Sequence, residues 1–214
     1  MPISPRLIRG GIILIDADTS FVRRIIALQY NPDTLSRSFQ IKGAGGEAGD
    51  HLEAMRLKGP PVETIKLDAE IDATDQLEAG DRQSSELGIH PQLAALELIV
   101  YPASGQLQQN DSAARSGTLE ITPAEAPLTL FVWSKSRILP VRVTEFSITE
   151  EAFDAGLNPI RAKVSLGMRV LSVDDLGFSH RGGSLFMSYL QQKEQLADKS
   201  KSGAFGGLGI TGIP

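Results

Sequence analysis

The sequence predicts a mainly β fold of the α+β class, an antiparallel barrel or a pair of packed sheets with a central and a C-terminal helix. Three observations support this. Alternating apolar and polar residues recur along most of the chain, as expected for strands with one buried face. Two segments, 91–101 and 185–197, instead place apolar residues at helical spacing. The 214 residues include no cysteine, so the fold must rely on its apolar core rather than on disulfides.

The most regular segment spans residues 137–172 and predicts a long antiparallel hairpin around a wide turn at 154–159. Its second half has one apolar parity, made of Ile160, Ala162, Val164, Leu166, Met168 and Val170. The other parity holds Arg161, Lys163, Ser165, Gly167 and Arg169. In the first half the apolar parity shifts between Val143 and Phe146, which predicts a β-bulge inside the strand.

Further strands are predicted at 9–16, 21–30, 35–42, 61–73 and 128–134. In segment 61–73 the apolar set is Ile65, Leu67, Ala69 and Ile71, and the opposite set is Thr64, Lys66, Asp68, Glu70 and Asp72. Residues 75–88 can hold a short helix, and Pro91 suits the first position of the next one. We expect Ser184 to cap the C-terminal helix, because a serine hydroxyl can accept from a free amide of the first turn.

The predicted organisation is one domain over 1–197 followed by a glycine-rich tail over 198–214. Two flexible loops are expected inside the domain, near 43–60 and 103–126. The second is a long polar segment for which no regular structure is predicted, and such segments are commonly functional or mobile.

No pattern in the sequence predicts catalysis. The three histidines, His51, His90 and His180, share no motif, and adjacent Glu150 and Glu151 would point to opposite faces of a strand. The glycine-rich segment 43–50 lacks the Lys and Ser or Thr of a phosphate-binding loop, and 16–19 lacks the Gly and distal Glu of a calcium loop. We therefore expect no enzyme, no cofactor and no metal site.

Charge and hydropathy exclude two further classes. The net charge of -5 argues against nucleic-acid binding, which usually needs a basic face. The longest apolar runs, 11–15 and 93–101, are too short to cross a bilayer, so no direct membrane insertion is expected.

The string LPVRVTEFSITEEAFDAGLNPIRAKVSLGMRVLS over 139–172 resembles the tube-protein family of contractile injection systems, which are phage-tail-like particles with an inner tube, a sheath and a baseplate. It is most similar to the adaptors or initiators that join the central spike to the first tube ring. Segments 27–32 and 185–197 also fit this family. The resemblance implies a hexameric ring that contacts a spike or hub protein, inner-tube proteins and other baseplate components. It also implies assembly in the cytoplasm before incorporation into the particle.

Two candidate interfaces follow. The acidic face of Asp68, Glu70 and Asp72 and the basic face of Arg161, Lys163 and Arg169 are complementary, and some of these charges could meet across or near a subunit boundary; two independently solvated faces are the alternative. In the tail, Phe205, Leu208 and Ile210 are expected to anchor on a neighbouring subunit or baseplate component. The competing function is a monomeric β-domain that binds a small ligand or carbohydrate.

Overall fold

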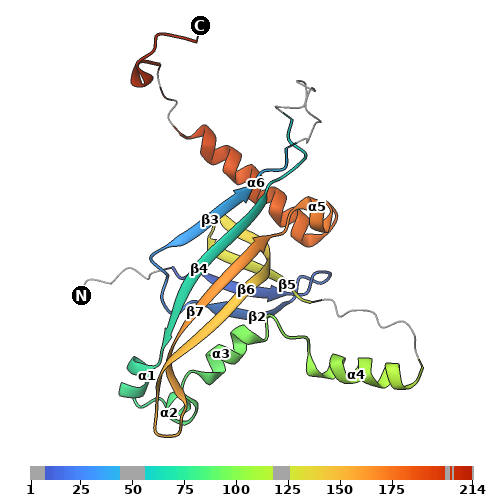
Figure 1. The fold of residues 1–214 in the computed structure, drawn as a ribbon, viewed down its shortest axis with the longest axis vertical. Coiled ribbons are helices and arrows are strands. Elements are labelled where there is room, and N and C mark those ends of the chain that lie inside the picture. The colour runs from blue at the N-terminus through green and yellow to red at the C-terminus, as the bar shows by residue number, and fades with distance from the viewer. Residues whose placement is uncertain (1–7, 44–55, 118–125, 201–202, 204, 214) are drawn as a thin grey trace.

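The computed structural model describes residues 8–43, 56–117, 126–200, 203 and 205–213, and it contains one seven-stranded antiparallel sheet (Figure 1). The strands in chain order are β1 (Gly11–Ile15), β2 (Val22–Ala27), β3 (Leu35–Gln40), β4 (Val62–Asp72), β5 (Leu128–Ser134), β6 (Arg137–Phe153) and β7 (Pro159–Val170). Their order across the sheet is β2-β1-β5-β6-β7-β4-β3. Each of the seven strands falls where the sequence predicts one, and the mainly β class is confirmed.

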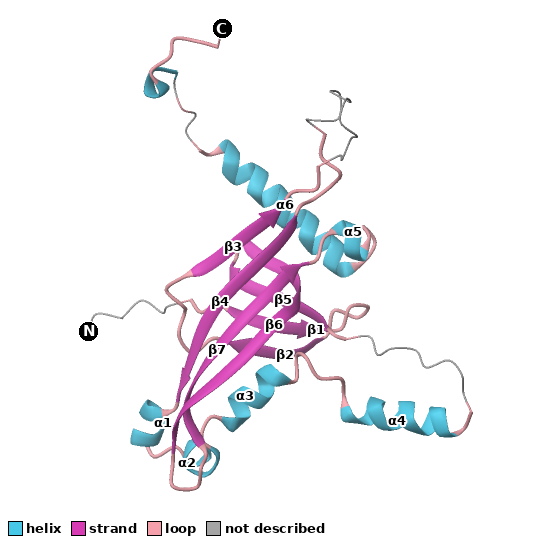
Figure 2. Cartoon of the chain, in the orientation of Figure 1, coloured by secondary structure: helices cyan, strands magenta, loops and turns pink. Residues whose placement is uncertain are grey.

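The sheet is open, which corrects the expectation of a closed barrel or two packed sheets. Strands β2 and β3 are its two edges, although they are consecutive in the chain. The sheet twists strongly, so that β1, β2 and β5 pass behind β4, β6 and β7 in the view of Figure 2. The alternating pattern determines which strands have a buried face, but not whether the first and last strands of a sheet meet.

The β6–β7 hairpin forms as predicted. The register shifts between Val143 and Glu145, so the predicted bulge lies where the apolar parity changes. On β7, Ala162, Val164, Leu166, Met168 and Val170 are all buried. The same parity rule holds on β4, where Ile65, Leu67, Ala69 and Ile71 are buried. These two strands pair directly and supply the centre of the core.

Six α-helices and one 3-10 helix occur in the described residues. They are α1 (Thr74–Glu78), α2 (Arg82–Leu87), α3 (His90–Glu97), α4 (Ser104–Arg115), α5 (Val173–Leu176), α6 (Arg181–Asp198) and η1 (Phe205–Leu208). Helices α3 and α6 contribute Leu93, Leu96, Phe186 and Tyr189 to the core. No helix of the described residues is long and apolar enough to cross a membrane.

Several helix predictions were wrong in detail. Residues 104–115 form α4 where no regular structure was expected; its Gln, Ala and Arg residues are adequate helix formers, and Asp111 and Arg115 form an i,i+4 ion pair at 3.0 Å. Helix α3 ends at Glu97 rather than at residue 101, and Pro102 disfavours helix at the residue before it.

Helix α6 begins before Ser184, so the predicted cap was also wrong. The Nδ1 atom of His180 accepts from the Gly182 N–H at 3.0 Å and caps the helix. Gly182 and Gly183 are buried in its first turn, where an added Cβ on Gly183 would meet the Gly177 carbonyl. The helix therefore starts where glycines permit close packing. Most of the glycine-rich loop near 43–60 and residues 118–125 of the second loop lie outside the described residues.

Candidate assembly surfaces

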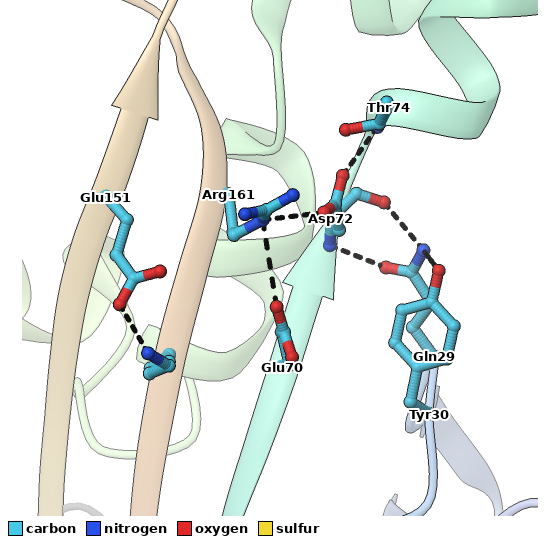
Figure 3. Close-up of polar contacts among 8 residues, drawn as sticks. Gln29, Tyr30, Glu70, Asp72, Thr74, Glu151 and Arg161 are labelled. Carbon is cyan, nitrogen blue, oxygen red and sulfur yellow. Dashed lines mark hydrogen bonds and ion pairs between the residues drawn. The ribbon is translucent and has the colours of Figure 1, made fainter.

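The charged residues predicted for an interface are brought together on β4 and β7 of the same chain. In the register of these strands Glu70 is opposite Lys163 and Asp72 is opposite Arg161. The Arg161 Nε atom lies 2.6 Å from Asp72 Oδ2 and 3.7 Å from Glu70 Oε1 (Figure 3). Neighbouring strands of opposite charge thus stabilise their own pairing.

The other predicted charges also have partners within the chain. Lys163 pairs with Glu151 of β6 at 2.7 Å, and Arg169 pairs with Asp175 of α5 at 2.5 Å. The Ser165 hydroxyl donates to Asp68 at 2.5 Å. The two faces are therefore joined side by side into one polar surface. Contact of this surface with a neighbouring subunit stays a prediction.

The electrostatics of this surface follow from these contacts. Burial of the Asp72 carboxylate opposes its ionisation, but hydrogen bonds from Thr74 and the ion pair with Arg161 outweigh it and hold its pKa below the ordinary value. Asp72 in turn raises the pKa of Arg161, and Glu151 raises the pKa of Lys163. Asp72, Arg161 and Lys163 are therefore charged at neutral pH. This arrangement favours a fixed ladder of ion pairs rather than acid–base chemistry.

Gln29, which the sequence did not single out, closes one side of this cluster. Its side-chain amide donates to the Asp72 carbonyl at 2.6 Å and accepts from the Asp72 N–H at 3.0 Å (Figure 3). The segment after β2 is thereby tied to the end of β4, although no strand pairing joins them. No sequence pattern could have identified this contact, because it joins residues 43 positions apart.

A buried carboxylate, Glu63, was also missed. Its side chain is only 5% exposed and is paired with Arg37 of β3 at 2.8 Å and Lys193 of α6 at 3.1 Å. The Arg37 guanidinium also donates to the Tyr189 hydroxyl at 2.9 Å. Glu63 shares the parity of Ile65, so the alternation itself placed it on the covered face. The cluster fastens α6 across β3 and β4.

The two edge strands carry exposed apolar side chains. Phe21, Val22 and Ile25 are exposed on or just before β2, and Phe39 and Ile41 on or just after β3. Within the described residues neither edge has a strand on its outer side. An open edge of this kind is a template for pairing with another chain.

The glycine-rich tail continues beyond the C-terminal end of α6, away from the sheet (Figure 1). Leu208, Ile210 and Ile213 are exposed there. Phe205 begins the short helix η1. Its side chain lies outside the described residues. The predicted anchors are thus placed on a segment that leaves the body of the protein.

Two features bear on catalysis and metal binding. His180 is occupied as the cap of α6, and His51 lies outside the described residues. The part of the chain that the structure describes has no group of three or more His, Cys, Asp or Glu side chains placed to hold a metal ion.

No family model matches this sequence, and no curated protein matches it. Among solved structures, the chain is similar to one in the cryo-electron microscopy structure of the anti-feeding prophage baseplate, sixfold symmetrised. That match covers 79% of this chain and 93% of the other, with 12% identity and a TM-score of 0.26. At this level the similarity carries no argument about function.

Proposed function

We propose that this chain is a structural component of a contractile injection system, acting in the baseplate and inner tube. It forms a hexameric ring that joins the central spike to the tube, templates tube growth and leaves a channel for payload. It acts by assembly and catalyses no reaction. The resemblance of the 139–172 hairpin to tube proteins supports the assignment of this chain to a phage-tail-like particle.

The observation that carries the assembly role is the open sheet with apolar side chains at both of its edges. Ile25 on β2 is 67% exposed, and Phe39 on β3 is 46% exposed. An open edge of this kind invites aggregation unless another surface covers it. In a head-to-tail ring each copy has its β2 edge covered by one neighbour and its β3 edge by the other. A monomeric ligand-binding domain has no such use for two apolar edges.

The test is the oligomeric state of the chain, measured alone and after co-expression with the spike and tube proteins of its own particle. Light scattering and electron microscopy should find a sixfold ring, either free or seated on the spike. A monomer under both conditions would contradict the proposal and favour the ligand-binding alternative.

A matched pair of variants links the ring to the open edge. Ile25→Lys places a charge on the β2 edge, a common way to block edge pairing, and should prevent ring formation without unfolding the subunit. Lys135→Ala, in the exposed turn between β5 and β6, should assemble normally. Normal rings with Ile25→Lys would show that the β2 edge is not used.

A further inference from the structure

The tip of the β6–β7 hairpin combines an unfavourable backbone conformation with an exposed apolar side chain. Leu157 has a φ of +63°, in the left-handed region that favours Gly and Asn. Its side chain is 77% exposed, so this unfavourable conformation gains no burial within the subunit. A strained backbone that presents an exposed apolar side chain is typical of a binding element.

Hydrogen bonds around Asp154 hold the turn that contains Leu157. The Asp154 carboxylate accepts from the backbone N–H groups of Gly156 at 2.7 Å and Asn158 at 2.8 Å, and from the Asn158 side chain at 2.9 Å. The Leu157 N–H donates to the Asp154 carbonyl at 3.1 Å. The conformation of Leu157 is thus imposed by its neighbours rather than selected from a mobile loop.

Helix α2 and the start of α3 support the turn from outside. The Asn158 side chain donates to the Glu86 carbonyl at 3.3 Å, and the Ile89 N–H donates to the Pro159 carbonyl at 2.9 Å. Gly88 packs so closely on Pro159 that an added Cβ would collide with its carbonyl. Phe153, on the other arm of the turn, is half exposed and extends the apolar tip. The tip lies at the end of the molecule opposite α6 and the tail (Figure 1).

The same chain contains an open groove of matching chemistry beside the β2 edge. It encloses about 360 Å³ between β2, β4 and α3. Its apolar lining includes Ile25, Leu28, Ala69, Ile71, Ala95 and Leu96. Gln92 of α3 is an exposed member of the lining, so the groove is open to solvent. A volume of this size admits one or two large apolar side chains.

Charge complementarity indicates that the occupant is the hairpin tip of a second copy. Arg24, next to Ile25 on β2, is exposed, and Glu150, near the tip on β6, is also exposed. Among the described residues neither has an ion-pair partner. A tip that enters the groove of another copy can bring this carboxylate to this guanidinium while it buries Leu157.

We propose that Leu157 and Phe153 of one copy dock in the β2–α3 groove of the next copy, with Glu150 facing Arg24. The contact joins two different surfaces of identical subunits, so it repeats head to tail and closes into a ring where the rotation permits. It rests on the ring proposed above and specifies one contact that covers the β2 side of each subunit.

Substitution of Leu157 by Asn gives opposite effects on folding and on association. Asn tolerates the left-handed conformation, so Leu157→Asn should raise the Tm of the subunit by about 2 °C or more. Loss of the apolar anchor should weaken self-association about tenfold in sedimentation experiments. A lower Tm, or self-association as strong as in the wild type, would overturn the proposal.

Disulfide trapping tests the contact directly, because the chain has no cysteine of its own. Purified L157C and Q92C chains are mixed at high concentration and oxidised, so that the expected crosslink can form only between different copies. L157C mixed with K135C is the matched control. A covalent dimer in the first mixture above the control level is expected, and its absence would overturn the proposal.

The two proposals fail separately. If electron micrographs show sixfold rings but the crosslink between residues 157 and 92 does not form, the ring proposal stands and the proposed contact is wrong. If the crosslink forms but the copies never assemble into a ring, alone or on the spike, the contact is confirmed and the proposed function is wrong.

Discussion

The side-chain amide of Gln29 pairs with the backbone of Asp72 in the way a neighbouring strand would, with one bond donated at 2.6 Å and one accepted at 3.0 Å. It satisfies the last backbone groups of β4 and holds the segment after β2 beside them. The twisted sheet is thus fastened at this point by a side chain, although it does not close into a barrel.

Gln29→Ala should therefore destabilise the subunit by about 1–3 kcal/mol, because two partly buried backbone groups of Asp72 lose their partners. Chemical denaturation with urea measures this change. Gln109→Ala, on the exposed face of α4, removes a similar side chain and should change stability by less than about 0.5 kcal/mol. Equal stability of the two variants would show that the Gln29 contact is not formed.

Strand β7 provides a test of the core. Leu166→Asp places a charge without a partner among Ile65, Leu67 and their neighbours, and should cost more than about 3 kcal/mol or prevent folding. Arg161→Ser, on the opposite face of the same strand, loses half-exposed ion pairs that contribute about 0–1 kcal/mol each. Circular dichroism and soluble yield should separate the two variants clearly.

The ion-pair ladder predicts compensation between strands. Reversal of Glu70 and Asp72 to Lys places like charges opposite Lys163 and Arg161, and should lower both the Tm and the yield of assembled particles. Additional reversal of Arg161 and Lys163 to Glu should restore part of each. If the fourfold variant regains its Tm but not its assembly, the predicted contact of these residues with a neighbouring subunit is supported. Normal assembly of the variant with only Glu70 and Asp72 reversed would contradict that contact.

The turn carboxylate Asp154 predicts a pH dependence of stability. Side-chain and backbone hydrogen bonds from Asn158 hold its pKa below the ordinary value of about 4. A lowered folded-state pKa contributes stability above the unfolded-state pKa, and this contribution is lost as the pH falls through the folded-state value. The stability difference between wild type and Asp154→Ala should therefore be largest near pH 6 and shrink below about pH 4.

Urea unfolding at several pH values measures this difference. Asp33→Ala, at an exposed residue outside the turn, serves as the control for loss of a carboxylate. A difference between wild type and Asp154→Ala that grows on acidification would contradict the assignment.

The tail is predicted to act in assembly and not in folding. Deletion of 203–214 should leave the Tm unchanged, because Leu208, Ile210 and Ile213 are exposed in the subunit, yet it should reduce the yield of complete particles. The triple change Phe205→Ser, Leu208→Ser, Ile210→Ser should reproduce the loss if these side chains are the anchors. Full particle yield after the deletion would show that the tail is not part of the interface.

The sequence by itself determined the strands, the faces they bury and the β6–β7 hairpin. It did so because alternation has a period of two residues, and burial of one face imposes that period on the chain. Even the bulge after Val143 was visible as a change of parity. Glu63 could have been placed in the same way, because it shares the parity of Ile65.

Only the tertiary structure decided how these elements meet. The open edges at β2 and β3, the clamp of Gln29 on Asp72 and the pairing of Asp72 with Arg161 all join distant parts of the chain, so no local period records them. The start of α6 at His180 depended on close packing against Gly177. The left-handed conformation of Leu157 is imposed by Asp154 and its neighbours, against the preference of leucine itself. A residue type reveals only its own local preference, so the sequence could not predict this conformation.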